Sequence, residues 1–364
     1  MHIAIDARFI NSTTGRYIER LVTYLEDIDH INNYSVLVRE KDKDYWKPKR
    51  DNFKVVVAEF DQFSFAEQLG FNKMLKKLKA DLVHFGIVQQ PVLYRGKKVT
   101  TFHDMTLVKT YNSDKNWLMY HSKQFVGRFV FRDIARTNDH IIAISEYTKK
   151  ELLEFTHIPE EKVTVIYESS DVASGGSKKY PLEFKQYLLN VGAQSDYKNI
   201  KRLGDAHQVL LKRYPDLGLV LVGRLNAAAQ ANKTYFEKKN YKNIVFTDFI
   251  PDDQLNWIYA HATAYVHPSL MEGFGLPGLE AMQHGLPLVS SNATCLPEIY
   301  GDAAYYFDPK NIESMARAID DVLTSEKIRH DLSKKGYQQI KKYSWKKMAE
   351  QTHAIYMQVL KSKN

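Results

Sequence analysis

Short apolar runs alternate along the chain with longer segments in which apolar positions recur every three or four residues. The short runs are rich in β-branched residues, and several are apolar throughout, as expected of parallel strands buried on both faces. The longer segments predict helices that cover such a sheet, so we expect an α/β fold. The strand candidates are residues 3–7, 34–39, 53–58, 81–85, 98–102, 140–144 and 163–167, followed by 187–192, 217–223, 244–250, 262–267, 287–291 and 304–308.

A polar segment divides these strands into two groups. Residues 168–180, ESSDVASGGSKKY, offer little apolar surface and predict an interdomain linker. Each group opens with a strand, a loop and a predicted helix, at 16–25 in the first and 199–214 in the second. We therefore expect two doubly wound, Rossmann-like domains, 1–170 and 171–344, with a ligand cleft at the carboxyl ends of their sheets.

Composition and charge narrow the class of protein. The 364 residues are 44% hydrophobic and 26% charged, which excludes a disordered or collagenous chain. The net charge of +8 favours an anionic partner, which leaves nucleotides, phospholipid head groups and nucleic acid open. One cysteine, Cys295, excludes an intramolecular disulfide and a Cys-based zinc site. Asp6 and Arg8 interrupt the first apolar stretch too early for a signal peptide, and no run approaches the roughly 20 residues of a membrane span. We expect a cytoplasmic protein whose membrane contact, if any, is peripheral.

The most informative stretch is residues 267–287, HPSLMEGFGLPGLEAMQHGLP. A predicted strand ends at His267, and Pro277 lies where a new helix would begin. Two glycines allow a tight turn and close approach to a ligand. The backbone amides of the turn would then lie at a helix amino terminus, which suits a phosphate. These amides belong to Gly273, Phe274, Gly275 and Leu276.

Two carboxylates flank this turn. Glu272 directly precedes it, and Glu280 lies in the predicted helix about a turn and a half later. One carboxylate could face a group near the phosphate, and the other a hydroxyl further along the ligand. The alternative is an ordinary strand-to-helix turn with two solvated glutamates.

Three basic residues follow predicted strands. Lys198 lies between a strand with its loop and a helix, so its ammonium could reach a phosphate at the mouth of the sheet, although most surface lysines are solvated. His103 follows residues 98–102, where a lone histidine is more often structural than functional. Arg224 follows Gly223 at the end of another strand.

The stretch EGFGLPGLE, with seven residues between its outer glutamates, resembles the signature of the retaining glycosyltransferases of family 4, which have the GT-B fold. Other blocks match the family in order along nearly the whole chain: IAIDARFI, TGRYIERL, KADLVHF, VTTFHDM, IIAISEYTKKEL, VTVIY, VGAQSDYKNIKRL, LVLVGR, LPEIYGDAAYYFDP and YSWKKMAEQTHAIY. The resemblance implies two Rossmann-like domains that face each other across a cleft, with a carboxyl-terminal helix, 345–364, that packs back on the first domain.

The resemblance also implies roles for the residues of the second domain. Glu280 would contact the ribose of a nucleotide sugar, and Glu272 the hydroxyls of the donor sugar. The amides from Gly273 through Leu276 would serve the sugar and the diphosphate. Lys198 would be the diphosphate-binding lysine.

Other implied positions are less regular. The family often has an arginine where this chain has Ala193, so Arg224 is a candidate substitute for that cationic contact. His103 would lie beside the donor sugar as a hydrogen-bonding group. Gly15 belongs to the first loop of the family, and Ile250 to the region whose backbone flanks the nucleotide base.

The implied reaction is transfer of a hexose from a nucleotide diphosphate sugar to a hydroxyl, with retention at the anomeric carbon. GDP-mannose is favoured because the blocks resemble bacterial mannosyltransferases of polysaccharide assembly, while UDP-glucose, UDP-galactose and UDP-N-acetylglucosamine stay open. The acceptor would be a glycan or a lipid-linked glycan of a cell-surface polysaccharide. No DxD-like pair ends a predicted strand, so we expect no metal and no other cofactor.

One segment bears on membrane contact. In FNKMLKKLKA, residues 71–80, the apolar positions 71, 74, 75 and 78 share a helical face that lysines surround. This face could lie on an anionic membrane, or it could pack on the sheet before the next strand.

Two rival functions were weighed. A GT-B epimerase or phosphorylase would share the architecture but not the spacing of Glu272 and Glu280. A basic nucleic-acid-binding protein would be expected to carry a zinc finger, an RNP-like aromatic motif or a concentrated basic stripe. The sequence contains none of these, so we expect no nucleic-acid partner.

Overall fold

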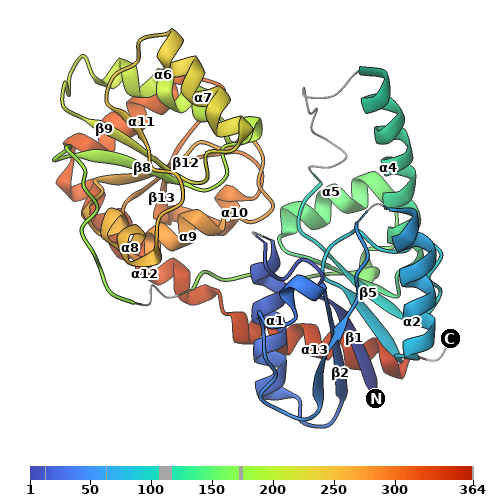
Figure 1. The fold of residues 1–364 in the computed structure, drawn as a ribbon. Coiled ribbons are helices and arrows are strands. Elements are labelled where there is room, and N and C mark those ends of the chain that lie inside the picture. Colours follow the sequence, from blue (N-terminus) through green and yellow to red (C-terminus); the bar gives the residue numbers. More distant parts are fainter. Residues whose placement is uncertain (13, 63, 106–116, 172–174, 363–364) are drawn as a thin grey trace. The chain divides into compact units, whose positions relative to one another are not determined.

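The chain forms two compact units, each built around one parallel sheet (Figure 1). The computed structural model describes residues 1–12, 14–62, 64–105, 117–171 and 175–362. Unit 1 is Met1–Glu168 together with Ser344–Asn364, and unit 2 is Ser169–Tyr343.

Unit 1 has a seven-stranded sheet in the order β3-β2-β1-β4-β5-β6-β7, with every pair parallel. The strand order reverses between β1 and β4, which neighbour each other although two strands separate them in sequence. The strands are β1 (His2–Asp6), β2 (Asn33–Val38), β3 (Phe53–Val57), β4 (Leu82–Phe85), β5 (Lys98–Phe102), β6 (His140–Ala143) and β7 (Val163–Val165). The helices are α1 (Gly15–Ile28), α2 (Asn72–Leu78), α4 (Trp117–Thr137), α5 (Glu146–Thr156) and α13 (Trp345–Lys361), with short turns η1 (Glu40–Asp42), η2 (Glu67–Phe71) and η3 (Glu160–Lys162).

Unit 2 repeats the plan with six parallel strands in the order β10-β9-β8-β11-β12-β13. Its order reverses between β8 and β11, where a doubly wound sheet opens a crevice for ligands. The strands are β8 (Tyr187–Val191), β9 (Gly218–Val222), β10 (Ile244–Phe246), β11 (Ala264–His267), β12 (Leu288–Ser291) and β13 (Ala304–Phe307). The helices are α6 (Ile200–Leu210), α7 (Ala227–Lys238), α8 (Asp252–His261), α9 (Leu276–Gln283), α10 (Leu296–Tyr300), α11 (Ile312–Thr324) and α12 (Glu326–Gln339), with short turns η4 (Asp196–Lys198), η5 (Gly301–Ala303) and η6 (Ile340–Lys342).

The strand predictions are confirmed, since each predicted segment overlaps one strand. Most observed strands are shorter than predicted, because the apolar runs continue into the loops. In β10, for example, the predicted 244–250 ends at Phe246. Six strands, β4, β5, β6, β9, β11 and β12, are buried along their whole length, which explains why continuous apolar runs identified them.

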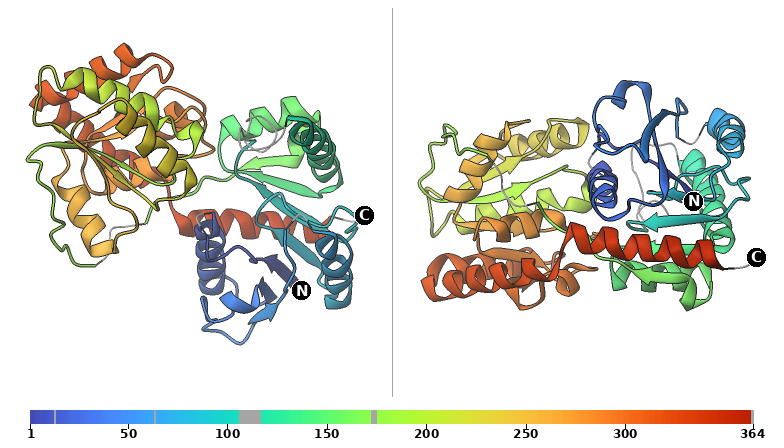
Figure 2. Two further views of the ribbon diagram at one scale, coloured as in Figure 1. Left: turned by 45° about the horizontal axis from the view of Figure 1, so that its top comes forward. Right: turned by 90° about the horizontal axis from the view of Figure 1, so that it is seen from below.

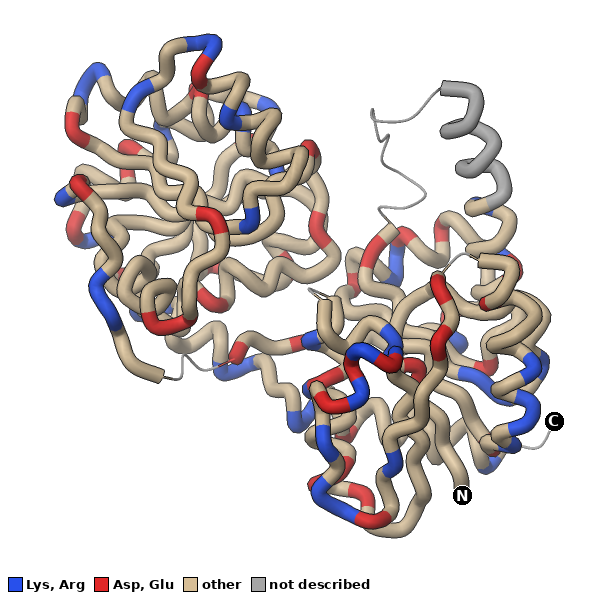
Figure 3. The backbone as a smooth tube through the Cα atoms, in the orientation of Figure 1, with Lys and Arg blue, Asp and Glu red and all other residues tan. Residues whose placement is uncertain are grey.

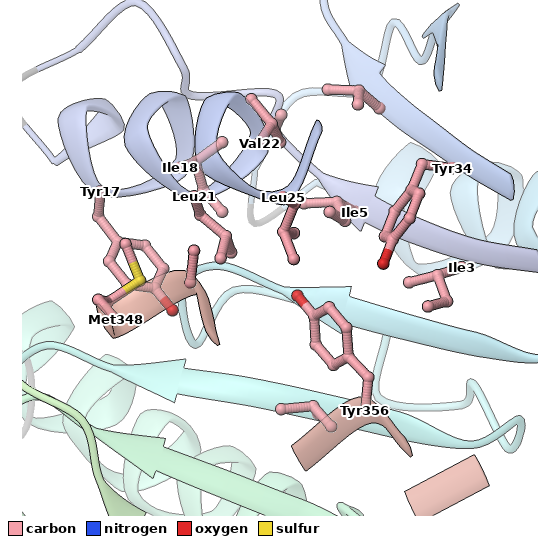
Figure 4. Packing of buried hydrophobic residues seen from close by; sticks show 14 of the residues in the cluster. Ile3, Ile5, Tyr17, Ile18, Leu21, Val22, Leu25, Tyr34, Met348 and Tyr356 are labelled. Carbon is pink, nitrogen blue, oxygen red and sulfur yellow. The ribbon is translucent and has the colours of Figure 1, made fainter. Parts of the chain in front are cut away.

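The core of unit 1 is completed by the end of the chain. Residues of α13, among them Met348 and Tyr356, lie in one buried cluster with Tyr17 of α1 and Ile3 of β1 (Figure 4). Views from two further directions show α13 running along this unit (Figure 2). The tail therefore belongs to the first unit, although it follows the second in sequence.

Residues 71–80 do not offer this apolar face to a membrane, so the second of the two alternatives, packing on the sheet, is confirmed. Phe71 and Leu75 are buried against the sheet, and Met74 and Leu78 pack on the same cluster. The face at positions 71, 74, 75 and 78 is an ordinary core face, because burying it against the sheet removes its apolar surface from water.

Candidate functional site

Three charged or polar side chains of unit 2 meet at the point where its strand order reverses. Lys198 ends η4 in the loop after β8, and Glu272 lies in the loop after β11. The Lys198 Nζ atom is 2.6 Å from Glu272 Oε1. His267, the last residue of β11, brings its Nε2 atom to 3.0 Å from the same oxygen. Adjacent strands thus carry a cation and a carboxylate to one edge of the sheet.

This carboxylate is held in its charged form. The side chain of Glu272 is only 11% exposed, and burial alone would raise its pKa. The charge of Lys198 and the contact with His267 outweigh that effect and hold the pKa of Glu272 well below its usual range. The backbone is fixed as well, because the Glu272 N–H donates to Thr294 Oγ1 and its carbonyl accepts from Cys295 Sγ.

The glycine-rich turn leads directly into a helix, as the sequence predicts. Gly275 has a φ of +97° and caps the amino terminus of α9, with Pro277 in the first turn. A Cβ atom at Gly275 would lie 2.4 Å from the Tyr300 hydroxyl, which itself donates to the Gly275 carbonyl at 2.6 Å. Only glycine fits this position. The turn formed by Gly273 through Leu276 therefore lies at the amino terminus of α9.

Glu280 lies within α9, one turn beyond this amino terminus. The hydroxyl of Tyr259, on α8, donates to Glu280 Oε2 at 3.5 Å. Tyr259 also stacks on His284, with the ring centroids 4.6 Å apart. The α8–α9 contact thus orients Glu280 from one side.

Unit 1 carries a second polar cluster at the carboxyl edge of its sheet, around His103. His103 follows β5, and its Nε2 atom is 2.8 Å from the Gly86 carbonyl oxygen. Its Nδ1 atom is 3.0 Å from Glu168 Oε1, in a side chain that is 5% exposed. Both ring nitrogens therefore face acceptors, an arrangement that only the doubly protonated ring satisfies.

The electrostatics of this cluster agree with its geometry. Burial opposes the charged form of His103, but the Glu168 carboxylate and the Gly86 carbonyl raise its pKa above the ordinary value. Burial instead lowers the pKa of nearby His84 to about 3, so this second ring is neutral. Tyr17 packs edge-on against His103 with centroids 4.9 Å apart. The Glu168 carboxylate and the Gly86 carbonyl thus favour the protonated ring of His103 in this arrangement.

Gly15 begins α1, the first helix after β1. A Cβ atom there would lie 2.1 Å from the Ile10 carbonyl oxygen, so the loop closes on itself at this glycine. The Gly15 N–H donates to two oxygens of Ser12, the backbone carbonyl oxygen and the side-chain hydroxyl oxygen.

Two predicted residues are not brought to the Lys198–Glu272 pair. Arg224 is exposed after β9, on the opposite side of β8 from β11, and its guanidinium lies 5.7 Å from the Phe249 ring centroid. Ile250 is buried directly before α8. The role of Arg224 as a substitute for the missing arginine therefore gains no geometric support.

Two residues of these clusters were not assigned from the sequence. Glu168 lies in the segment predicted as a linker, yet it is buried against His103, and Ser169 and Ser170 after it are buried as well. The exposed described residues of that segment are 175–179. His267 was noted only as the end of a strand, although the pattern of a polar residue ending a buried strand could have indicated it. Glu168 lies 65 residues from His103 in sequence, so no local sequence pattern identifies the two as partners.

Within the described residues, no three His, Cys, Asp or Glu side chains form a group that could hold a metal ion. Nor is any of the helices in the described part long and apolar enough to cross a membrane.

Comparison with known structures identifies the fold. Sucrose-phosphate synthase from Thermosynechococcus elongatus has a similar structure, with a TM-score of 0.78 and 16% identity over 99% of both chains. WaaG, a glycosyltransferase of lipopolysaccharide biosynthesis, gives a TM-score of 0.71 and 15% identity over 97% of this chain and 99% of that one. Two parallel-sheet, Rossmann-like units with these neighbours define the GT-B fold.

Sequence comparison then gives the family. The family model described as glycosyl transferases group 1 matches residues 177–339, and the model of glycosyltransferase family 4 matches residues 14–173. The O-antigen chain mannosyltransferase B of Escherichia coli is 31% identical over 277 residues, which are 71% of this chain and 70% of the relative. The serotype-specific mannosyltransferase WbdA of Escherichia coli is 30% identical over 62% of this chain but only 29% of its own length. The chain belongs to the family 4 glycosyltransferases.

Proposed function

We propose that this glycosyltransferase moves a hexose, with mannose favoured, from a nucleotide diphosphate sugar to a hydroxyl of a glycan or lipid-linked acceptor in cell-surface polysaccharide synthesis. The observation that carries the proposal is the Lys198–Glu272 ion pair beside the amino terminus of α9, at the strand-order reversal of unit 2. A cation, a carboxylate and a helix amino terminus together match the charges and hydroxyls of such a donor.

The diphosphate would be held by two kinds of positive group. The ammonium of Lys198 supplies a full charge, and the amides from Gly273 through Leu276 supply a helix amino terminus. Both are fixed before the reaction, so they would stabilise the negative charge that develops on the leaving diphosphate. This charge compensation comes from the protein itself, and we propose that transfer proceeds without a metal ion.

The two carboxylates would bind different parts of the donor. Glu280 lies four residues beyond Leu276, or about 6 Å along the helix axis at 1.5 Å per residue. That separation suits a ribose next to a diphosphate at the helix end. Glu272, which is next to the turn, would accept hydrogen bonds from the sugar hydroxyls.

His103 would contact the donor sugar as a cation rather than act as a base. Its ring nitrogens already face Gly86 and Glu168. A retaining transfer breaks the bond between the anomeric carbon and the diphosphate, and forms a bond from that carbon to the acceptor oxygen on the same face. We propose that the acceptor proton passes to the departing phosphate oxygen, because His103 has no free site to receive it.

The choice of mannose is supported by the names of two relatives, an O-antigen chain mannosyltransferase and a serotype-specific mannosyltransferase of Escherichia coli. GDP is the favoured nucleotide, with UDP as the alternative. We further propose a cytoplasmic protein that reaches its acceptor at an anionic membrane surface, in line with its net charge of +8.

Ligand binding and product analysis test the proposal. Thermal shifts with GDP, UDP, ADP and their common sugars should show selective stabilisation by one nucleotide family, and Glu280→Ala should lose it. Transfer to a mannoside acceptor should give an α-linked product by NMR, at a rate that a metal chelator does not change. A lack of stabilisation by every nucleotide, with the wild-type protein folded, would contradict the donor site.

A further inference from the structure

The segment after β12, residues 294–300, holds the glycine turn of unit 2 at both ends, and we name it the clamp. At one end, the Thr294 hydroxyl accepts from the Glu272 N–H at 3.2 Å. At the other end, the Tyr300 hydroxyl donates to the Gly275 carbonyl at 2.6 Å. The turn proposed to bind the donor is therefore shaped by the clamp as well as by its own glycines.

The clamp begins with a strained residue. Thr294 has a φ of +56°, in the left-handed region, where a β-branched side chain is a rare outlier. Seven non-glycine residues among those described have a positive φ, and Thr294 is the only β-branched residue in that set. Strain of this kind persists only where the surrounding contacts hold it, and it recurs at functional sites. Glycine would adopt the same backbone without strain, but it has no hydroxyl to accept from Glu272.

The hydroxyl of Thr294 fixes Glu272 from its backbone side. The carboxylate end of the same residue is held by Lys198 at 2.6 Å and by His267 at 3.0 Å. A bound diphosphate would draw Lys198 away from the carboxylate, whereas the bond from the Glu272 N–H to Thr294 would remain. Thr294 can therefore keep Glu272 in place while the lysine serves the phosphates.

The clamp itself contributes almost no charge. Residues 294–300 contain one charged side chain, that of Glu298, so nearly all of this segment is tan in Figure 3. The positive groups proposed to hold the diphosphate are Lys198 and the amino terminus of α9. Removing the Thr294 hydroxyl would therefore change the orientation of Glu272 without changing the charges of the site.

We propose that Thr294 is a positioning residue for the transfer reaction. Through the Glu272 N–H, its hydroxyl orients the Glu272 carboxylate toward the sugar of a nucleotide-sugar donor. The inference rests on the proposed function and deepens it, because it assigns a residue to recognition of the sugar as distinct from the nucleotide. Loss of the hydroxyl should weaken binding of the sugar and leave binding of the nucleotide nearly unchanged.

Three variants separate the hydroxyl from the backbone strain. Thr294→Val removes the hydroxyl and keeps the β-branched shape, Thr294→Gly removes both the hydroxyl and the strain, and Thr294→Ser keeps the hydroxyl. Thr324→Val is the matched control, because the Thr324 hydroxyl donates to the Asp320 carbonyl at 2.8 Å in α11. Melting temperatures show which variants are folded, and Thr294→Gly supplies the same test if Thr294→Val does not fold.

Two measurements on the full chain follow the hydroxyl. Hydrogen exchange at the Glu272 amide, read by mass spectrometry without any ligand, should become about tenfold faster in Thr294→Val and Thr294→Gly. In calorimetric titrations, both variants should bind GDP and UDP within about twofold of the wild type. The advantage of GDP-mannose over GDP, or of UDP-glucose over UDP, should fall about tenfold. Thr294→Ser and Thr324→Val should match the wild type in both measurements.

Two outcomes would overturn the inference alone. One is a wild type that binds a nucleotide sugar together with hydroxyl-free variants that keep its full advantage over the nucleotide, or that keep the exchange rate of the wild type. The other is an equal loss of nucleotide and nucleotide-sugar affinity, because the clamp would then support the whole site rather than orient Glu272. A folded wild type that binds no nucleotide sugar would instead contradict the proposed function, and with it the orientation of Glu272 toward a sugar.

Discussion

The Lys198–Glu272 ion pair leads to the prediction that removing the charge of Glu272 destabilises the fold but strengthens nucleotide binding. In the free protein the Glu272 carboxylate is paired with the Lys198 ammonium, which a bound diphosphate would need. Removing the negative charge with Glu272→Gln should therefore weaken the fold but strengthen the binding of a nucleoside diphosphate. Lys198→Met removes the cation itself and should abolish most of that binding.

The structure sets the size of both effects. Lys198 Nζ and Glu272 Oε1 are 2.6 Å apart, and the two side chains are 19% and 11% exposed. Breaking a fully buried pair costs 3–5 kcal/mol, so a pair with this much water contact should lose about 2 kcal/mol of unfolding free energy. Glu272→Gln also removes the carboxylate that competes with a diphosphate for Lys198. We expect GDP or UDP to bind about tenfold more tightly to Glu272→Gln, which corresponds to about 1.4 kcal/mol.

Calorimetric titration with GDP and UDP is the assay, with urea unfolding to measure stability. Lys201→Met is the matched control, because Lys201 lies three residues further along the chain and is 45% exposed. The Lys201→Met variant should bind GDP and UDP with the affinity of the wild type. A nucleotide sugar should lose part of its advantage over the nucleotide in Glu272→Gln, because the amide oxygen of glutamine is a weaker acceptor for the sugar hydroxyls than the carboxylate.

The reasoning would be refuted if Glu272→Gln bound the nucleoside diphosphate as weakly as Lys198→Met does. Glu272 would then hold Lys198 in place for the phosphate rather than compete with it. Equal affinity in Lys198→Met and the wild type would be a stronger contradiction, since the lysine would then make no contact with the diphosphate.

Two further predictions concern the pH response of unit 1 and the glycine turn of unit 2. The protonated ring of His103 stabilises the fold below its unfolded pKa of 6.5, and this contribution fades as pH rises through the higher folded pKa. Glu168→Gln should lower that folded pKa and flatten the dependence, as an NMR titration of His103 would record, and an unmoved titration would contradict the pairing. Gly275→Ala should cost about 2–4 kcal/mol in urea unfolding, because of the φ of +97° and the contact with Tyr300. Gly176→Ala, with no neighbour within 4 Å, should stay within about 0.5 kcal/mol of wild type, and equal losses for both would refute the steric argument.

The fold could be predicted from the sequence because its strands are buried on both faces. A strand such as β9, GLVLV, is apolar at every position, and each such run is followed by a helical pattern. The glycine turn was equally local, since Gly275 and Pro277 are only two positions apart in sequence. Features of this kind depend on neighbours a few residues apart.

The pairing of distant residues could not be predicted. His103 and Glu168 come from different loops, and nothing near Glu168 distinguishes it from the polar residues that follow. The same holds for Lys198 and Glu272, which were assigned separately and proved to be partners. A partner across the sheet becomes visible only once the order of the strands is known.

The helix before β4 shows a second limit. Its lysines and apolar residues gave two consistent interpretations, a membrane face or a core face. The structure decides for the core face, because Phe71 and Leu75 are buried and Met74 and Leu78 pack on the same cluster. The spacing of the apolar positions is the same for both interpretations, so it does not tell whether lipid or the sheet covers the face.

The return of α13 to unit 1 has a consequence for the order in which the protein is made. Trp345, Met348 and Tyr356 of α13 are buried in the core of unit 1, and Tyr356 also contacts buried His84. A ribosome must synthesise the 175 residues of Ser169–Tyr343 before these side chains emerge. At 5–20 residues per second, that delay is roughly 10–35 s. The amino-terminal unit is thus the first to be translated, while the second unit is the first whose core can be complete.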